Sequence, residues 1–113
     1  MPPKNDAALD FLLTRRSRPA KTLTTPVPDA ADLDVILTAA ARTPDHGRRE
    51  PWRFIVLEKP ALDRLAQAIP ARGAALGLTE DQITKACAQY GNADLAVVVV
   101  SAPVKSEKIP LIE

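Results

Sequence analysis

Residues 95–100 read Leu-Ala-Val-Val-Val-Val, and this run decides the fold because it has no polar residue on either face. Such a strand is typical of a sheet interior, with strands on both sides and further layers above and below it. The run is far shorter than the roughly 20 residues that a membrane-spanning helix needs. We therefore expect a strand buried on both faces and no membrane segment.

One other stretch of the sequence predicts a strand. Residues 52–57, Trp-Arg-Phe-Ile-Val-Leu, are rich in β-forming side chains. A sheet of only two strands is marginally stable in water. Because residues 109–113 follow so soon after the second strand, we expect an incomplete domain or one that a partner completes.

Apolar residues recur at helical spacing in four segments, residues 5–16, 29–42, 60–70 and 79–90. Asn5 and Asp29 are favourable N-caps, and Pro60 suits the first turn of a helix. Residues 79–82, Thr-Glu-Asp-Gln, form a capping box. Pro70 is expected to close the third helix, because proline has no backbone N–H to donate.

The composition bounds the function. The chain has 113 residues, enough for one domain, and its 15 Lys and Arg against 14 Asp and Glu leave a net charge of +1. A net charge of +1 produces too weak an electrostatic field for the protein as a whole to attract nucleic acid or an anionic membrane. The single cysteine, Cys87, forms no internal disulfide, and residues 1–5 lead into no apolar signal core. We expect a cytoplasmic protein.

Three cationic side chains and a hydroxyl follow the first predicted helix, at Arg15, Arg16, Ser17 and Arg18. Guanidinium groups offer paired donors to phosphate oxygens, and the serine adds a further hydrogen bond. A solvated cluster that interacts with the helix dipole explains the same pattern. Arg42, at the end of the second helix, has the same two interpretations.

The loop over residues 43–51 contains the only histidine, His46, among two prolines, a glycine and other ionisable residues. His46 could donate to a ligand oxygen, or it could be an inert surface residue. It makes a poor metal ligand, since no second histidine or cysteine pair stands at ligand spacing. Cys87 lies between two alanines of a helix and is expected to be a small packed residue.

Taken together, several motifs resemble the nitroreductase family of flavin enzymes, and most of all its small bacterial NAD(P)H nitroreductases. The likeness covers essentially the whole chain. It rests on these stretches: Leu13-Thr14-Arg15-Arg16-Ser17, Ala39-Ala40-Ala41-Arg42, Pro44-Asp45-His46 and Glu50-Pro51-Trp52-Arg53-Phe54.

The resemblance implies an α+β fold with a central sheet flanked by helices, and a homodimer that binds FMN at the subunit interface. It implies reduction of nitro compounds or quinones, as small-molecule electron acceptors, with electrons from NADH or NADPH. By this likeness Arg15, Arg16 and Ser17 hold the phosphate and ribityl side of the flavin, and Arg42 and His46 belong to the second cofactor-binding segment. The flavin itself carries the hydride, so no catalytic nucleophile is expected.

The sequence departs from the family pattern at three points. Pro19 stands where many members have a basic residue, and Lys21 is the nearest alternative. Arg48 and Glu50 replace the usual Asn and Gln before Pro-Trp. Members are also longer, and their later part supplies further strands, flavin-contacting loops and much of the dimer interface. We therefore expect residues 1–113 to be the N-terminal portion of one such domain, stopping near residues 108–110, shortly before the family's central helix.

Two other functions remain open on the sequence. One is a truncated, non-catalytic remnant or interaction module that keeps the fold without binding flavin. The other is a small nucleic-acid binder, which the near-neutral charge disfavours. Its arginines would be Arg15, Arg16, Arg18, Arg48 and Arg49, and they lie on connections rather than along one recognition helix.

Overall fold

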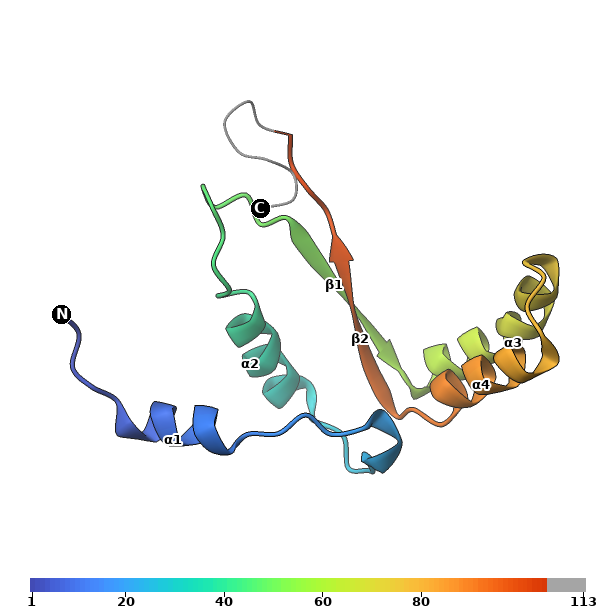
Figure 1. The fold of residues 1–113 in the computed structure, drawn as a ribbon, viewed down its shortest axis with the longest axis horizontal. Coiled ribbons are helices and arrows are strands. Elements are labelled where there is room, and N and C mark those ends of the chain that lie inside the picture. Colours follow the sequence, from blue (N-terminus) through green and yellow to red (C-terminus); the bar gives the residue numbers. More distant parts are fainter. Residues whose placement is uncertain (106–113) are drawn as a thin grey trace.

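The structure is a computed structural model that describes residues 1–105. Within this range the chain forms α1 (Asp6–Thr14), η1 (Ala20–Thr22), α2 (Ala30–Ala40), β1 (Trp52–Glu58), α3 (Lys59–Ala75), α4 (Glu80–Gly91) and β2 (Leu95–Ser101) (Figure 1). The α+β class expected from the sequence is confirmed. The segment 108–110, near which the chain was expected to stop short of a further helix, lies outside the described residues.

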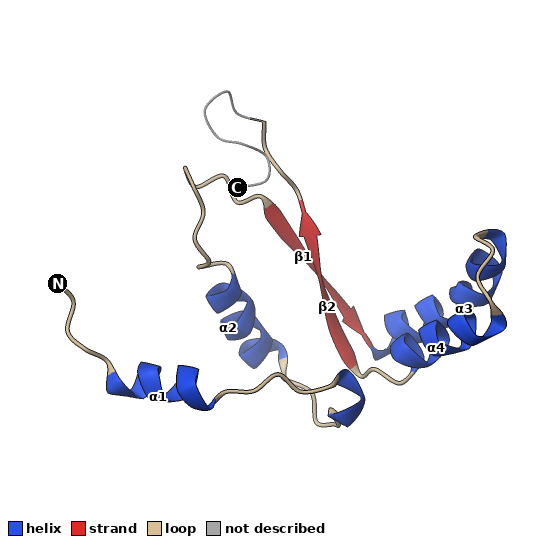
Figure 2. Ribbon diagram, in the orientation of Figure 1, coloured by secondary structure: helices blue, strands red, loops and turns tan. Residues whose placement is uncertain are grey.

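The two strands form an antiparallel ribbon, with α3 and α4 inserted between them in the chain (Figure 2). The register pairs Trp52 with Ser101 at one end and Glu58 with Leu95 at the other. One further hydrogen bond prolongs the ribbon, since the Ala102 N–H donates to the Pro51 carbonyl oxygen at 2.7 Å. Both predicted strands, and the shortage of further strands, are confirmed for the described part of the chain.

The expected burial of β2 on both faces is wrong for this chain. Val98 and Val99 are 41% and 66% exposed, and no residue of β2 is fully buried. Among the described elements α3 packs most closely against the sheet, and it does so at one end of the ribbon. The apolar run therefore has the composition of an interior strand, but residues 1–105 cover it only in part and leave Val98 and Val99 exposed.

The best-packed part of the molecule is the hairpin of α3 and α4. Leu62 on α3 is the one fully buried apolar side chain among the described residues. Gly73 allows the helices to approach, because a Cβ built there would lie 2.7 Å from Ile83 Cγ1. The Lys59 ammonium donates to the Gly91 and Ala93 carbonyl oxygens at 2.5 and 3.2 Å, which ties the start of α3 to the end of α4.

The prediction that Pro70 closes the third helix is wrong. Helix α3 continues to Ala75 with Pro70 inside it. A proline removes the N–H that would bond the carbonyl four residues earlier, here that of Ala66. In this structure the Cys87 Sγ of α4 lies 3.6 Å from the Ala66 oxygen and donates to it. A neighbouring helix thus supplies part of the bonding that the proline removes, and the expectation of a packed Cys87 is confirmed.

The predicted helix starts are confirmed. The Asn5 side chain accepts from the Ala8 N–H, and the Asp29 side chain accepts from the Asp32 N–H. Thr79 forms the predicted capping box, with hydrogen bonds in both directions to the residue three places later.

The first two helices end earlier than predicted. Helix α1 stops at Thr14, because the backbone of Arg15 is already extended, with φ −61° and ψ 150°. Helix α2 stops at Ala40 and continues only as turns. The segment 20–22 forms one 3-10 turn, in which the Thr22 hydroxyl donates to the Pro19 carbonyl oxygen.

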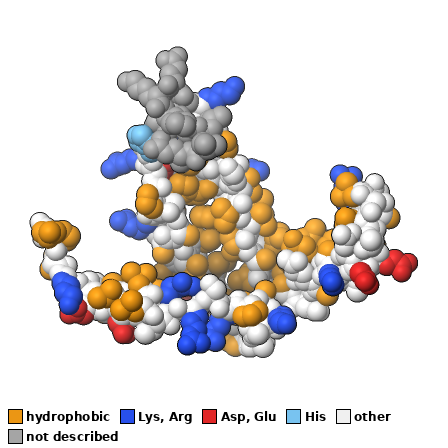
Figure 3. Space-filling model, in the orientation of Figure 1, with side chains coloured by type: hydrophobic (Ala, Val, Ile, Leu, Met, Phe, Trp, Pro, Cys, Tyr) orange, Lys and Arg blue, Asp and Glu red, His pale blue; other side chains and the backbone are white. Residues whose placement is uncertain are grey.

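The molecule as a whole is open. Its accessible surface is 9784 Å², whereas a compact protein of this mass exposes about 6,000 Å². The radius of gyration is 18.4 Å, against about 13 Å for a compact chain of this length. Apolar side chains lie at the surface over the sheet and along α1 (Figure 3).

Candidate functional site

The first group of predicted site residues lies in the extended segment directly after α1. Arg15 is the C-cap, with φ −61° and ψ 150°, and its backbone turns away from the helix axis. The Arg15 Nη2 donates to the Ser17 hydroxyl at 3.1 Å. Arg15, Arg16 and Ser17 are all exposed. The segment therefore presents guanidinium and hydroxyl groups to solvent, a donor set that suits an oxyanion.

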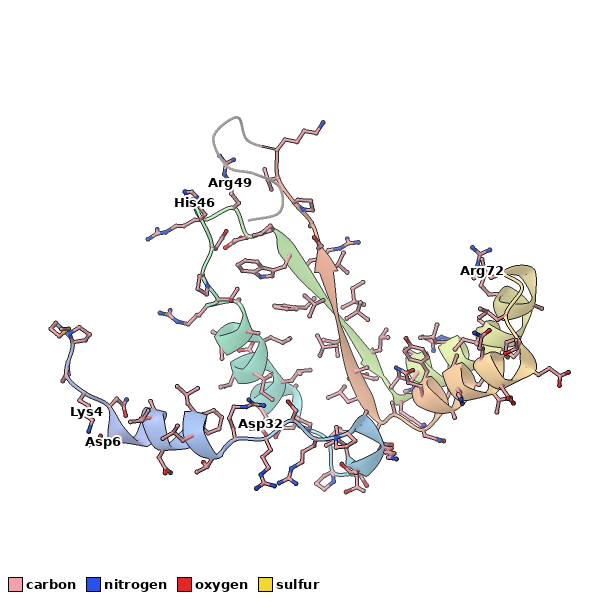
Figure 4. All side chains as sticks on the ribbon, in the orientation of Figure 1. Lys4, Asp6, Asp32, His46, Arg49 and Arg72 are labelled. Atoms are coloured by element: carbon pink, nitrogen blue, oxygen red, sulfur yellow. The ribbon has the colours of Figure 1, made fainter. Side chains whose placement is uncertain are left out.

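The second group follows α2, in the loop that leads into β1. Arg42 comes two residues after the end of α2, and His46 lies at the far tip of the loop beside Arg49 (Figure 4). The loop borders an open hollow of about 320 Å³. Its walls are formed by Ala41, Arg42, Thr43, Asp45, Arg48, Glu50 and Trp52. Arg42 therefore lines the hollow, whereas His46 is not among these wall residues.

The loop backbone has an unusual conformation. Gly47, Arg48 and Glu50 have φ angles of 73°, 51° and 48°, in the left-handed region that side chains other than glycine seldom adopt. The Asp45 carboxylate accepts from the Glu50 N–H at 2.7 Å, and the Asp45 carbonyl accepts from the Arg48 N–H at 3.2 Å. Asp45 thus bonds across the whole turn.

The sequence names Asp45 only as part of the Pro44-Asp45-His46 stretch and assigns it no role of its own. Its signal is the common preference of aspartate for bonding nearby backbone N–H groups in turns. The positive φ angles at Arg48 and Glu50 have no such signal, because neither residue type favours that region.

The structure does not bring the two groups together within one chain. Arg42 follows the C-terminal end of α2, while the segment after α1 lies near the opposite end of that helix (Figure 1). A helix of the length of α2 spans roughly 16 Å. The first helix also makes only marginal contact with the other elements of the described chain. The roles of Arg15, Arg16, Ser17, Arg42 and His46 therefore stay predictions.

Two further properties of residues 1–105 concern other kinds of site. No three His, Cys, Asp or Glu side chains within this range lie close enough to hold a metal ion together. No helix in the same range has both the length and the apolar character needed to cross a membrane.

Comparison with known proteins decides the family. A model of the nitroreductase family matches residues 12–109, which is most of the chain. The chain belongs to the nitroreductase family. The matched residues include both groups described above, and the resemblance seen in the sequence motifs is confirmed.

Two curated relatives of this nitroreductase-family chain carry related names. A protein of Haemophilus influenzae named "Putative NAD(P)H nitroreductase" is 38% identical over 94 residues, which are 83% of this chain and 50% of that protein. "Putative NAD(P)H nitroreductase YdjA" of Escherichia coli K12 is 34% identical over 103 residues, 91% of this chain and 55% of that protein. The chain spans about half the length of the curated relatives that it matches.

Proposed function

We propose that this chain forms the flavin-binding part of an FMN-dependent oxidoreductase that reduces nitro compounds or quinones with NAD(P)H. One observation carries the proposal: in a nitroreductase-family chain, Arg15, Arg16 and Ser17 form an extended, exposed segment of phosphate-binding side chains. The names of the relatives support the choice of electron donor. We also propose a cytoplasmic location, where NAD(P)H is available.

The residues present fit FMN. Arg15 and Arg16 supply guanidinium donors for the dianionic phosphate, and Arg15 orients the Ser17 hydroxyl beside them. Arg42 and His46, from the loop after α2, would approach the flavin ring system. Bound FMN supplies the hydride chemistry. The chain's own residues then only bind and orient the cofactor, so the proposal requires no catalytic nucleophile.

We further propose that residues 1–113 act as one domain within a homodimer. The two groups lie at opposite ends of α2, so one copy of the described chain does not surround a ligand with both. A second copy could bring its own loop to the first group and cover exposed apolar side chains at the same time. On α1 these are Leu9, Phe11, Leu12 and Leu13, which are between 46% and 75% exposed.

The experiment is an FMN titration of the purified chain, followed by flavin fluorescence and by size-exclusion chromatography on the same sample. We expect a flavin band that elutes with a dimer. The double variant Arg15→Ala, Arg16→Ala should bind FMN at least about tenfold more weakly, since each hydrogen bond to a charged group contributes about 1.5–3 kcal/mol.

The matched control removes the same charge elsewhere. Arg64 and Arg72 are exposed arginines of α3, and Arg72 lies far from the segment after α1 (Figure 4). The variant Arg64→Ala, Arg72→Ala should bind FMN as the parent chain does. Equal binding by both double variants would contradict the role of Arg15 and Arg16.

A second candidate is an interaction module without flavin. The observation that favours it is the large exposed apolar surface around a single buried leucine of the described chain. A chain that stays colourless and leaves FMN fluorescence unchanged at every concentration would favour this module over the flavoprotein.

A further inference from the structure

Asp45 differs from the residues around it. Among residues 1–50 all side chains are exposed except those of Leu33, Leu37 and Asp45, and Asp45 is the only one of the three that is polar. Asp45 is half-buried as a residue, and its carboxylate accepts an exposed hydrogen bond of 2.7 Å from the Glu50 N–H. The interaction closes a turn of six residues, from 45 to 50.

The turn needs such an anchor. Arg48 and Glu50 both have positive φ angles, which carry a steric cost for residues with a Cβ. Asp45 bonds the N–H of each of these two residues, once through its carbonyl and once through its carboxylate. The carbonyl of residue 45 bonds Arg48 whatever the side chain is, so the Asp45 carboxylate itself holds the Glu50 position.

The conformation has a consequence for the hollow beside the loop. Arg42 enters it from the end of α2 and Trp52 from the start of β1, while Arg48 is placed there by the turn. The wall also contains the acidic residues Asp45 and Glu50, and the Asp45 carboxylate is bonded to the Glu50 N–H. The two arginines suit the anionic oxygens of a ligand, and the indole of Trp52 suits a flat ring. If the turn relaxed, Arg48 would leave the wall that Arg42 and Trp52 form from regular elements.

We propose that Asp45 is a positioning residue that holds residues 45–50 in the turn which places Arg48 beside Arg42 and Trp52, and that this hollow receives the flavin. The proposal rests on the proposed function and adds to it a wall residue of the hollow whose carboxylate is already bonded to the Glu50 N–H. The Asp45 carboxylate acts through the Glu50 N–H, which closes the turn that contains Arg48.

The test compares three variants at this turn. Asp45→Ala removes the acceptor for the Glu50 N–H and should weaken FMN binding about tenfold, the effect expected for losing one such hydrogen bond. Asp45→Asn keeps an acceptor oxygen and should bind FMN within about threefold of the parent chain. Adding Glu50→Gly to Asp45→Ala should restore part of the affinity, because glycine adopts a positive φ without steric cost.

The matched control is Asp29→Ala. Asp29 also accepts one backbone N–H with its carboxylate, at 2.8 Å from the Asp32 nitrogen. It caps the start of α2, at the other end of that helix from the loop. Its removal should leave FMN binding unchanged, although the protein loses a comparable hydrogen bond.

Trp52, the only tryptophan, reports on the loop without any flavin. Its fluorescence should shift to longer wavelength in Asp45→Ala, return in the variant that also carries Glu50→Gly, and stay unchanged in Asp29→Ala. Failure of the parent chain to bind FMN would count against the proposed function alone, and the Trp52 emission would then decide on the turn. Unchanged emission in Asp45→Ala, or a shift without any loss of FMN affinity, would overturn the positioning role.

Discussion

At the scale of single residues, Gly73 shows how one missing side chain sets the distance between two helices. A Cβ at this position would meet Ile83 Cγ1 at 2.7 Å and Ile83 Cδ1 at 3.1 Å. The Cγ1 atom is next to the Cβ of Ile83, so it moves only if the isoleucine changes its rotamer. Close packing of the α3–α4 hairpin therefore depends on glycine here.

We expect Gly73→Ala to lower the free energy of unfolding by about 1 kcal/mol, because overpacking costs about 1–3 kcal/mol and the better helix propensity of alanine returns about 1 kcal/mol. The control is Gly91→Ala, also in a helix, where the new Cβ would lie at an ordinary 3.5 Å from Ala66 Cβ. That variant should be neutral or stabilising. Urea unfolding followed by circular dichroism measures both, and a stabilised Gly73→Ala would contradict the close contact.

At the scale of whole elements, helix α3 is held by groups outside itself. Pro70 leaves the Ala66 carbonyl without its usual donor, and Cys87 on α4 supplies one. The end of α3 thus depends on which residue of α4 faces it. This explains why a rule based on the proline alone stops the helix too early.

This dependence predicts a coupling between Pro70 and Cys87. Cys87→Ala should cost about 1 kcal/mol of unfolding free energy in the parent chain, through the lost thiol and its packing. It should cost less in a Pro70→Ala background, where the backbone N–H that the substitution introduces can bond the Ala66 carbonyl. A double-mutant cycle from urea unfolding measures the difference, and energies that add within about 0.5 kcal/mol would contradict the coupling.

Elements and site differ in how much of each could be predicted. Helix starts at Asn5, Asp29 and Thr79 follow from contacts over three residues, so the sequence predicts them correctly. The burial of β2 depends on which other elements pack against it, and the apolar sequence of the strand carries no information about those elements. The cationic residues of the candidate site can be found from the sequence, because clustered arginines stand out in the composition of a short segment. Asp45 has only the general signal of an aspartate in a turn, because its role depends on backbone angles at Arg48 and Glu50 that no propensity indicates.

At the scale of the whole molecule, both the open shape and the exposed apolar surface lead us to expect an interaction with a partner. The accessible area and the radius of gyration both exceed those of a compact chain. Contiguous apolar surface of this kind marks an interaction site in a soluble protein. A second copy of the chain is the occupant that the proposed function requires.

Val99 is well placed to test self-association, because it is 66% exposed in the middle of the apolar strand β2. Val99→Asp should reduce the dimer fraction about tenfold or more, since a carboxylate buried without a partner is costly. Ser101→Asp, which adds the same charge at an exposed position of the same strand, should leave the dimer intact. Size-exclusion chromatography with light scattering distinguishes them, and two equally dimeric variants would contradict association through this face.

The hairpin of α3 and α4 also has a consequence for the order of folding. The two helices follow one another directly, and the only buried apolar side chain of the described residues lies on the first of them. Contacts between neighbouring segments form quickly, because little chain entropy is lost in closing a short loop. During synthesis β1 leaves the ribosome before this hairpin and β2 after it. Packing of α3 against α4 would then bring the end of β1 close to the start of β2. The strands would pair first at Glu58 and Leu95, and pairing would proceed from there to Trp52 and Ser101.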